Sequence, residues 1–507
     1  MRLLKTIFSR TMLIALAFLA QVAVMLVVAF RFNQWYWEVQ AVSYVLAFFV
    51  LLHLINKKEN PAYKLPWLTV ILIFPIFGIL LYFLFAGHRI PRRQIRAQRA
   101  IQEACEPYLK SRHGEEVNAL LGKYAGLEKY LNRQAYTAGH LGNRVTHYPS
   151  GEACFEGLLR DLAGAEHFIF MEFFIIGSGK MWDAIHAILR EKAEAGVEVR
   201  ILYDDIGSLG RAPMRFAEKM RAEGIACYKF NPVRPIVTNV YNNRDHRKLV
   251  IIDGKVGYTG GFNIADEYIN ETHPHGYWKD TAVRVEGTAV KNMTALFLQN
   301  YAVPTKRVGE IAPYLTADCP RFADGGYVHP FGDGPNPFYP EQVAQDVYQH
   351  LIQTAEKRVW IMTPYLVPDY DLLCTLREAA LRGVDVRIVV PHVPDKKYVF
   401  RLTQSHYASL VSAGVRIYEY TPGFIHAKQA LFDDRMAFVG TVNLDYRSLV
   451  HHFEDGVLLF DCPCLAEIRA DFEGTFATSA PVPEAQCRKR RARGVIDSLL
   501  QLFSPLL

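Results

Sequence analysis

The stretch HRKLVIID, from His246 to Asp253, recurs 180 residues later as HAKQALFD, from His426 to Asp433. Both copies read H-x-K-x4-D. Each is followed, 17 residues after its histidine, by an asparagine shortly after a glycine, Asn263 or Asn443. One such pattern arises easily by chance, but two copies with the same downstream spacing do not. The chain therefore contains an internal duplication that supplies one set of polar residues twice.

The spacing within each copy predicts which side chains act together. The apolar, β-branched run Leu249–Ile252 predicts a strand. Because alternate side chains of a strand point to the same face, His246 and Lys248 should project together, and so should His426 and Lys428. Each copy then presents one imidazole and one ammonium on a single surface.

The aspartate of the motif is predicted to be structural. Asp253 and Gly254 read as a tight hairpin turn, with Lys255–Thr259 as the return strand. That strand carries Asn263 back to the His–Lys end of its partner and leaves the aspartate at the far end. We therefore predict that Asp253 and Asp433 hold the turn and take no part in the chemistry.

The duplication extends beyond the motif and predicts the fold class. Glu166–Met171 matches Glu356–Ile361, and Gly196–Ile201 matches Gly383–Ile388. Apolar strands alternate with amphipathic helices such as Met181–Ala195. This alternation is typical of an α/β fold, and we expect two α/β sandwiches with mixed sheets.

An acidic residue also recurs after each asparagine. Glu454 lies 28 residues after His426, and Asp280 lies 34 residues after His246, allowing for an insertion around 273–276. A carboxylate on the second nitrogen of an imidazole fixes its tautomer and favours its cationic form. We expect Glu454 to hold His426 and Asp280 to hold His246.

If the two copies face each other, they form one site that suits a phosphodiester. A neutral imidazole attacks phosphorus, and the other imidazolium protonates the leaving oxygen. The lysines and asparagines bind the phosphoryl oxygens where charge develops, so neither a metal nor a cofactor is expected. The predicted site residues are His246, Lys248, Asn263, Asp280, His426, Lys428, Asn443 and Glu454.

The paired motifs resemble those of the phospholipase D superfamily, and the chain as a whole is similar to the bacterial cardiolipin synthases. The supporting stretches are Met171–Ile176, Thr259–Tyr268, Trp278–Thr281, Thr363–Asp369 and Asn443–Leu449. The resemblance implies two tandem phospholipase D-like repeats that face each other, preceded by transmembrane helices. One departure is His451-His452 before Phe453-Glu454, where many relatives have an apolar residue and asparagine; it concerns the acceptor pocket.

The implied activity is transfer of a phosphatidyl group between two phosphatidylglycerol molecules, giving cardiolipin and glycerol through a phosphohistidine. In this superfamily the histidine of the N-terminal motif generally acts as nucleophile, which points to His246, with His426 as acid. The alternatives are a membrane-bound phospholipase D-type hydrolase, another phosphatidyltransferase, a nuclease, or a non-catalytic anionic-lipid scaffold. Apolar segments favour phosphatidylglycerol and anionic membrane lipids as partners over nucleic acid. An oligomer is compatible with the sequence, which predicts no particular state.

Three apolar runs near the N-terminus, Thr11–Phe30, Tyr36–Ile55 and Leu65–Ala86, have the length of membrane spans. A cleaved signal peptide is the alternative for the first run. A few basic residues before the first run favour an inside N-terminus, but the denser arginine cluster at 89–99 favours an inside catalytic domain, and three spans cannot satisfy both. We expect a multi-pass protein of the cell membrane with a cytoplasmic catalytic domain.

Composition adds few further constraints. The net charge of +6 excludes neither nucleic acid nor lipid. Glu172, on an otherwise apolar strand, is either a buried acid or a site residue, and Cys462 and Cys464 are interpreted as reduced thiols. The predicted segments are membrane segments 1–88, a basic helical connector 89–145, repeat one 146–305, a Gly/Pro-rich linker 306–335, repeat two 336–480, and a basic, amphipathic tail 481–507.

Overall fold

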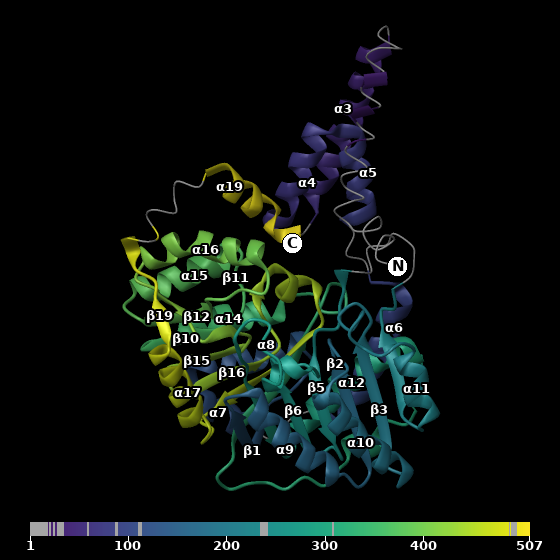
Figure 1. Cartoon of the computed structure of the whole chain (residues 1–507). Helices are drawn as coiled ribbons and strands as arrows, with labels where there is room; N and C mark the ends of the chain where they lie inside the picture. Colours follow the sequence, from purple (N-terminus) through teal and green to yellow (C-terminus); the bar gives the residue numbers. More distant parts are fainter. Residues whose placement is uncertain are drawn as a thin grey trace. The chain divides into compact units, whose positions relative to one another are not determined.

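The protein is described from a computed structural model of the chain (Figure 1). The described residues are 19, 22–23, 26–27, 35–57, 60–86, 90–109, 114–233, 242–306, 309–485, 487 and 494–506. The chain forms two compact units. We call residues 1–89, 235–239 and 498–507 the helical unit, and residues 90–234 and 240–497 the main unit.

The helical unit contains α3 (Tyr36–Asn56), α4 (Pro61–Ile73) and α5 (Pro75–Phe85). Within the described residues, one helix, Trp37–Asn56, is long and apolar enough to cross a membrane. The predicted span 65–86 is instead divided between α4 and α5, because Phe74 leaves the helical conformation and Pro75 starts a new helix. The predicted span 11–30 lies largely outside the described residues.

The main unit is built on a sheet of 15 strands with a duplicated order. Outward from the central antiparallel pair β1–β9, one half runs β8, β6, β5, β2, β3, β4 and the other runs β18, β16, β15, β10, β12, β13, with β19 at the second edge. In both halves the last three of these strands are parallel to one another and the others antiparallel. The predicted α/β class with mixed strands is confirmed, and the matching orders support two repeats.

The strands of the first half are β1 (His140–Tyr148), β2 (Phe168–Phe173), β3 (Glu198–Asp204), β4 (Ala226–Phe230), β5 (Lys248–Ile252), β6 (Val256–Gly260) and β8 (Ala282–Glu286). Those of the second are β9 (Gly326–Asp333), β10 (Arg358–Met362), β12 (Asp385–Pro391), β13 (Arg416–Tyr420), β15 (Gln429–Phe432), β16 (Met436–Gly440), β18 (Glu454–Phe460) and β19 (Ser479–Pro481). In Figure 1 the teal strands β5, β2 and β3 belong to the first half, and the green and yellow strands β10, β12 and β19 to the second.

Helices bury both faces of the first half-sheet. Phe168 and Phe170 of β2 belong to a core that includes α12 (Val290–Thr305), whereas Ile169 and Met171 belong to a second core on the opposite face. That second core includes side chains of α9 (Gly151–Ala163) and α10 (Lys180–Glu194). Further helices among the described residues of the main unit are α6 (Arg92–Leu109), α7 (Gly114–Leu121), α8 (Ala125–Gln134), α11 (Phe216–Ala222), α13 (Ala312–Leu315), α14 (Val343–Thr354), α15 (Tyr370–Leu381), α16 (Lys397–Val411) and α17 (Leu465–Ala477).

Two strands lie where the sequence predicts connections. Helices α6, α7 and α8 occupy the predicted connector, but β1 begins within it, at His140. The predicted linker 306–335 contains β9, which is fully buried between β1 and β18. The linker interpretation is therefore wrong for 326–333, because strand pairing on both sides overrides the low strand propensity of the glycines and proline in this stretch. In the tail, α19 spans Gly494–Phe503, and the basic run 488–493 lies outside the described residues.

Candidate active site

The two motif hairpins have the same construction. β5–β6 and β15–β16 are antiparallel pairs, and both motif aspartates adopt a positive φ at the turn, 54° for Asp253 and 51° for Asp433. The carboxylate of Asp253 accepts hydrogen bonds from the backbone N–H groups of residues 166, 167 and 168, at 2.7–2.9 Å. Asp433 accepts from those of residues 356, 357 and 358. These contacts support the predicted structural role, since each aspartate fixes the start of a neighbouring strand.

The first histidine meets an acidic residue of the second repeat. An isolated parallel bridge joins Asp245 to Phe453, and the backbone N–H of His246 donates to the carbonyl of Phe453 at 2.9 Å. Glu454 follows directly and faces the imidazole. Both of its carboxylate oxygens lie 2.9 Å from Nδ1 of His246.

The second histidine meets an acidic residue of the first repeat. The short strand β7 (Tyr277–Lys279) pairs in parallel with β14 (Gly423–Ile425). The backbone N–H of His426 donates to the carbonyl of Lys279 at 2.7 Å, and Oδ2 of Asp280 lies 2.8 Å from Nδ1 of His426.

The carboxylates are thus exchanged between the repeats, and the expected pairing of Glu454 with His426 and of Asp280 with His246 is wrong. Spacing along the chain reports the order of residues within one repeat. The carboxylate that reaches each imidazole is instead decided by two short strand contacts between the repeats. Each imidazole–carboxylate pair therefore requires both repeats.

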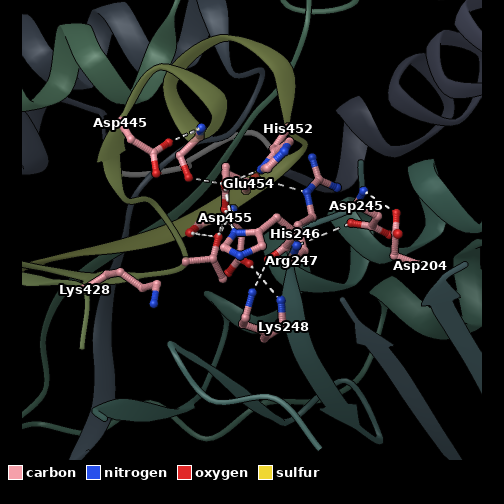
Figure 2. Close-up of polar contacts among 12 residues, drawn as sticks. Asp204, Asp245, His246, Arg247, Lys248, Lys428, Asp445, His452, Glu454 and Asp455 are labelled. Carbon is pink, nitrogen blue, oxygen red and sulfur yellow. Dashed lines mark hydrogen bonds and ion pairs between the residues drawn. The ribbon is translucent and has the colours of Figure 1, made fainter. Parts of the chain in front are cut away.

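The lysines lie beside the histidines, and the two asparagines differ. Nζ of Lys248 donates to the carbonyl of His246 at 2.6 Å, and Nζ of Lys428 lies 3.0 Å from Nδ1 of His426. Figure 2 shows Lys248 next to His246, with Lys428 coming from the second repeat. The amide oxygen of Asn263 accepts a hydrogen bond from the backbone N–H of Ile175, and its amide N–H donates to the hydroxyl of Tyr268. The buried amide oxygen of Asn443 has no hydrogen-bond partner within the described part of the chain.

Burial governs the charges of the site. It lowers the pKa of His246 well below 6.5, and it lowers the pKa of His426 to about 4 together with the nearby charge of Lys428. Burial also lowers the pKa of Lys248 to about 8 and of Lys428 to about 7, although neighbouring carboxylates oppose the shift. Both imidazoles are therefore neutral near pH 7 in the free protein.

The partner carboxylates remain ionised. Burial alone would raise the pKa values of Glu454 and Asp280, but the histidine that each contacts lowers both values below the ordinary range by charge and hydrogen bonding. An ionised carboxylate on Nδ1 requires that nitrogen to carry the proton. Each imidazole then keeps its lone pair on Nε2, the atom available to a substrate.

We expect the loss of activity at alkaline pH to follow the deprotonation of the two lysines. A cation whose pKa is lowered keeps its charge below that pKa and loses it as the pH rises. Because Lys428 and Lys248 titrate near 7 and 8, kcat/KM for an anionic phosphodiester should fall as the pH rises through this range. Lys428→Arg should move the fall to higher pH, because arginine stays protonated. A profile that is flat from pH 7 to 9 in the unmodified enzyme would contradict this.

Several residues of the site carry no signal in the sequence. Thr441 and Ser448 both donate to the carboxylate of Glu454, and Asp455 accepts from the backbone N–H of Lys248. These residues can be recognised as part of the site only from the contacts that form when the two repeats pack together. Glu172 accepts from the amide of Asn300, and burial raises its pKa well above the usual range, which supports the interpretation as a buried acid.

One group of side chains has the composition of a metal site. His246, His452 and Glu454 each offer a ligand atom, and these atoms lie within 4.8 Å of one another. Two imidazoles and one carboxylate are ligands that suit Zn²⁺. In the same place, however, the carboxylate already accepts two hydroxyl hydrogen bonds, and the charge of Lys248 acts on His246.

The repeated fold, with one histidine and one lysine from each half at a shared centre, defines a phospholipase D-type protein. The solved structure of phosphatidylserine synthase from Haemophilus influenzae Rd KW20 shares this fold, with a TM-score of 0.57 at 15% identity over 76% of this chain and all of that one. The family described as "Cardiolipin synthase, PLD-like domain" matches residues 158–297 and 348–476, and "Phospholipase_D-nuclease N-terminal" matches 45–87.

Curated relatives specify the family. The chain is 34% identical to cardiolipin synthase 2 of Bacillus anthracis over 91% of this chain and 90% of that protein. It is 34% identical to a cardiolipin synthase of Geobacillus kaustophilus (strain HTA426) over 90% and 92% of the two chains. An uncharacterised protein of Streptococcus mutans is 40% identical over 90% of this chain and 99% of that one. The chain belongs to the cardiolipin synthase family of the phospholipase D superfamily.

Proposed function

We propose that this protein is a cardiolipin synthase that transfers a phosphatidyl group from one phosphatidylglycerol to another, releasing glycerol. The observation that carries the proposal is the pair of crossed imidazole–carboxylate contacts, His246 with Glu454 and His426 with Asp280. Two oriented imidazoles with two buried lysines provide a nucleophile, an acid and the charge that binds a phosphodiester.

In the first step, Nε2 of His246 bonds to phosphorus and the bond to the glycerol oxygen breaks. The imidazolium of His426 gives its proton to that oxygen. In the second step, a hydroxyl of another phosphatidylglycerol bonds to phosphorus, the N–P bond breaks, and the hydroxyl proton returns to His426. Lys248 and Lys428 bind the phosphoryl oxygens in both steps, joined by the amide N–H groups of Asn443.

The two carboxylates favour different roles for the two histidines. Glu454 contacts Nδ1 of His246 with both oxygens, which stabilises the positive charge that the ring gains when Nε2 bonds to phosphorus. His426 lies beside Lys428, so its imidazolium is a strong acid that readily protonates an alkoxide. The bound phosphodiester anion supplies the negative charge that favours the initial protonation of His426.

An acid-quenched reaction with phosphatidylglycerol labelled in its phosphate would test the assignment. Peptide mapping should locate the label on His246. A label on His426 alone would reverse the two roles but leave the reaction class intact.

Product analysis tests the reaction itself and separates the alternatives. Purified protein in vesicles of labelled phosphatidylglycerol should yield cardiolipin and glycerol in equal amounts. Phosphatidic acid as the main product would instead indicate a hydrolase, because water would then be the acceptor. No turnover would favour a lipid-binding scaffold.

Activity should persist without divalent metal, because Lys248 and Lys428 supply the charge that a metal would otherwise provide. Enzyme treated with a chelator and then desalted should keep at least about half of its activity. A partial effect of added cations would not contradict the mechanism, because cations also screen the charge of anionic lipid surfaces. Complete loss that one divalent ion restores would overturn the mechanism and point to His246, His452 and Glu454 as ligands.

Membrane attachment supports a lipid substrate. The apolar helix Trp37–Asn56 suits a span, and we propose a multi-pass protein with its catalytic unit in the cytoplasm. The loop after β3 also carries exposed apolar side chains, with Met214 84% exposed and Leu209 52%. In the same loop, Ser208 donates to the carbonyl of Phe174, whose ring lies 5.1 Å from that of His246. We infer that this loop enters the lipid surface beside the site.

Glutamate at both Leu209 and Met214 should therefore reduce activity on phosphatidylglycerol in vesicles by about tenfold or more. Burying one such side chain in an apolar phase contributes about 1.5–3 kcal/mol. Activity on a short-chain, soluble phosphodiester should be unchanged. Equal losses on both substrates would contradict a role at the lipid surface, and Leu381→Glu, an exposed site on α15, is the control.

A further inference from the structure

A third histidine, His452, lies beside the motif histidine of the first repeat. Its ring centroid is 5.4 Å from that of His246, and its Nδ1 is 3.6 Å from a carboxylate oxygen of Glu454. It follows a single π-helical turn, Arg447–His451, and precedes β18 by two residues. Figure 2 shows His452 on the opposite side of Glu454 from Lys248.

Neither ring nitrogen of His452 has a hydrogen-bond partner among the residues that the structure describes, and both are buried. A distance of 3.6 Å to Glu454 is an ion-pair distance but too long for a hydrogen bond. Glu454 does not need His452, because its oxygens already accept from His246, Thr441 and Ser448. A buried polar group without a partner destabilises a protein, so its presence here calls for a ligand that pairs with it.

His452 is no less accessible than the residues that must meet the substrate. It is 8% exposed, compared with 7% for His246 and 8% for His426. An opening that admits a phosphodiester to His246 therefore admits part of the same molecule to the neighbouring ring.

The surrounding charges decide what kind of ligand His452 accepts. Glu454 lies on the Nδ1 side of the ring, 3.6 Å from that nitrogen. A carboxylate facing Nδ1 favours the tautomer with its proton on that nitrogen, which leaves a lone pair on Nε2. A lone pair accepts a hydrogen bond from a hydroxyl group but gives nothing to a phosphoryl oxygen, which is itself an acceptor.

We propose that His452 forms a subsite for a hydroxyl group of the lipid headgroup, next to the phosphohistidine on His246. This inference rests on the proposed transferase function and identifies what selects the alcohol. Nε2 of His452 accepts from a glycerol hydroxyl that does not react, while the reacting hydroxyl faces phosphorus. The same contact serves the departing glycerol in the first step and the incoming glycerol headgroup in the second. A polyol is therefore held in preference to water or to an alcohol with a single hydroxyl.

The test compares glycerol with 1-propanol, which has the same carbon chain and a single hydroxyl. Vesicles of phosphatidylglycerol are incubated with both alcohols, each carrying its own label, and the phosphatidyl products are resolved. The unmodified enzyme should favour glycerol. His452→Leu should lower the glycerol-to-propanol product ratio by at least about tenfold, because a site that binds a hydroxyl discriminates against an alcohol lacking it. His452→Gln, whose amide oxygen can accept the same hydrogen bond, should keep most of the preference.

The glycerol-to-propanol product ratio distinguishes hydroxyl binding by His452 from a purely structural role of this residue, since a distorted site slows the reactions of both alcohols to the same extent. His392→Leu is the matched control, because His392 is an exposed histidine paired with Glu419 and is not among the residues of the site. An unchanged ratio in His452→Leu would refute the subsite even if total turnover fell. His452→Ala carries the same test if the leucine variant does not fold. If the unmodified enzyme forms neither alcohol product and no cardiolipin, the transferase function itself fails, which is a distinct result. If it forms cardiolipin but neither alcohol product, the hydroxyl subsite is refuted while the transferase function stands.

Discussion

Alanine at His246 or at His426 should each lower the turnover of phosphatidylglycerol by on the order of 10⁴-fold or more, and the double variant should lose little more than either single one. Without His246 no bond to phosphorus forms, and without His426 the glycerol alkoxide leaves unprotonated. Groups that act as a unit show such non-additive losses. The measurement is the rate of cardiolipin formation by protein that remains folded and membrane-bound.

His392→Ala provides the control for this experiment, because it removes an exposed histidine that is not among the site residues and should leave turnover unchanged. A single variant, at either motif position, that retains near-normal turnover would refute a shared site. Two independent sites, one in each repeat, would instead leave each single variant with about half of the turnover and the double variant with almost none.

The motif hairpins could be predicted from the sequence because their signals are local. A β-branched run and a turn at Asp253-Gly254 each refer to fewer than about ten neighbouring residues, the range over which strand and turn preferences act. The structural role predicted for Asp253 and Asp433 followed from that geometry, and their hydrogen bonds support it. Their specific partners, the backbone N–H groups at the start of β2 and β10, lie far away in sequence.

The arrangement between the repeats could not be predicted in the same way. The bridge from Asp245 to Phe453 and the pairing of β7 with β14 are short contacts with no sequence pattern. They nevertheless decide which carboxylate reaches which imidazole. Likewise β9 is a strand because β1 and β18 flank it, and composition alone gave it the character of a linker.

The helical unit shows a third kind of limit. Hydropathy identified the run 65–86 as apolar throughout, but it does not report continuity of the helix. Pro75 has no N–H to donate to the preceding turn, so the run forms two shorter helices. Apolar composition therefore did not predict where this segment divides into two helices.

Because the carboxylates are exchanged between the repeats, Glu454→Gln and Asp280→Asn should both lower turnover strongly, but at different steps: Glu454→Gln at the attack on phosphorus and Asp280→Asn at protonation of the leaving glycerol. Glutamine at 454 removes the charge that holds the Nδ1 proton of His246, and a wrong tautomer leaves no lone pair at Nε2. The loss of an oriented carboxylate of this kind costs about 10⁴-fold in turnover. Asparagine at 280 instead removes the negative charge that favours the protonated form of His426. His246 can then still bond to phosphorus, but the leaving glycerol oxygen has no proton donor.

A substrate whose leaving group needs no proton distinguishes the two variants. With a phosphatidyl ester of p-nitrophenol, Asp280→Asn should release a rapid burst of p-nitrophenol close to that of the unmodified enzyme, whereas Glu454→Gln should show none. Both variants should remain slow with phosphatidylglycerol, because glycerol departs only when protonated. The opposite pattern, a burst from Glu454→Gln and none from Asp280→Asn, would assign Glu454 to the acid. Since Glu454 contacts His246 at 2.9 Å with both oxygens, that result would make His426 the nucleophile or refute the exchanged pairing itself.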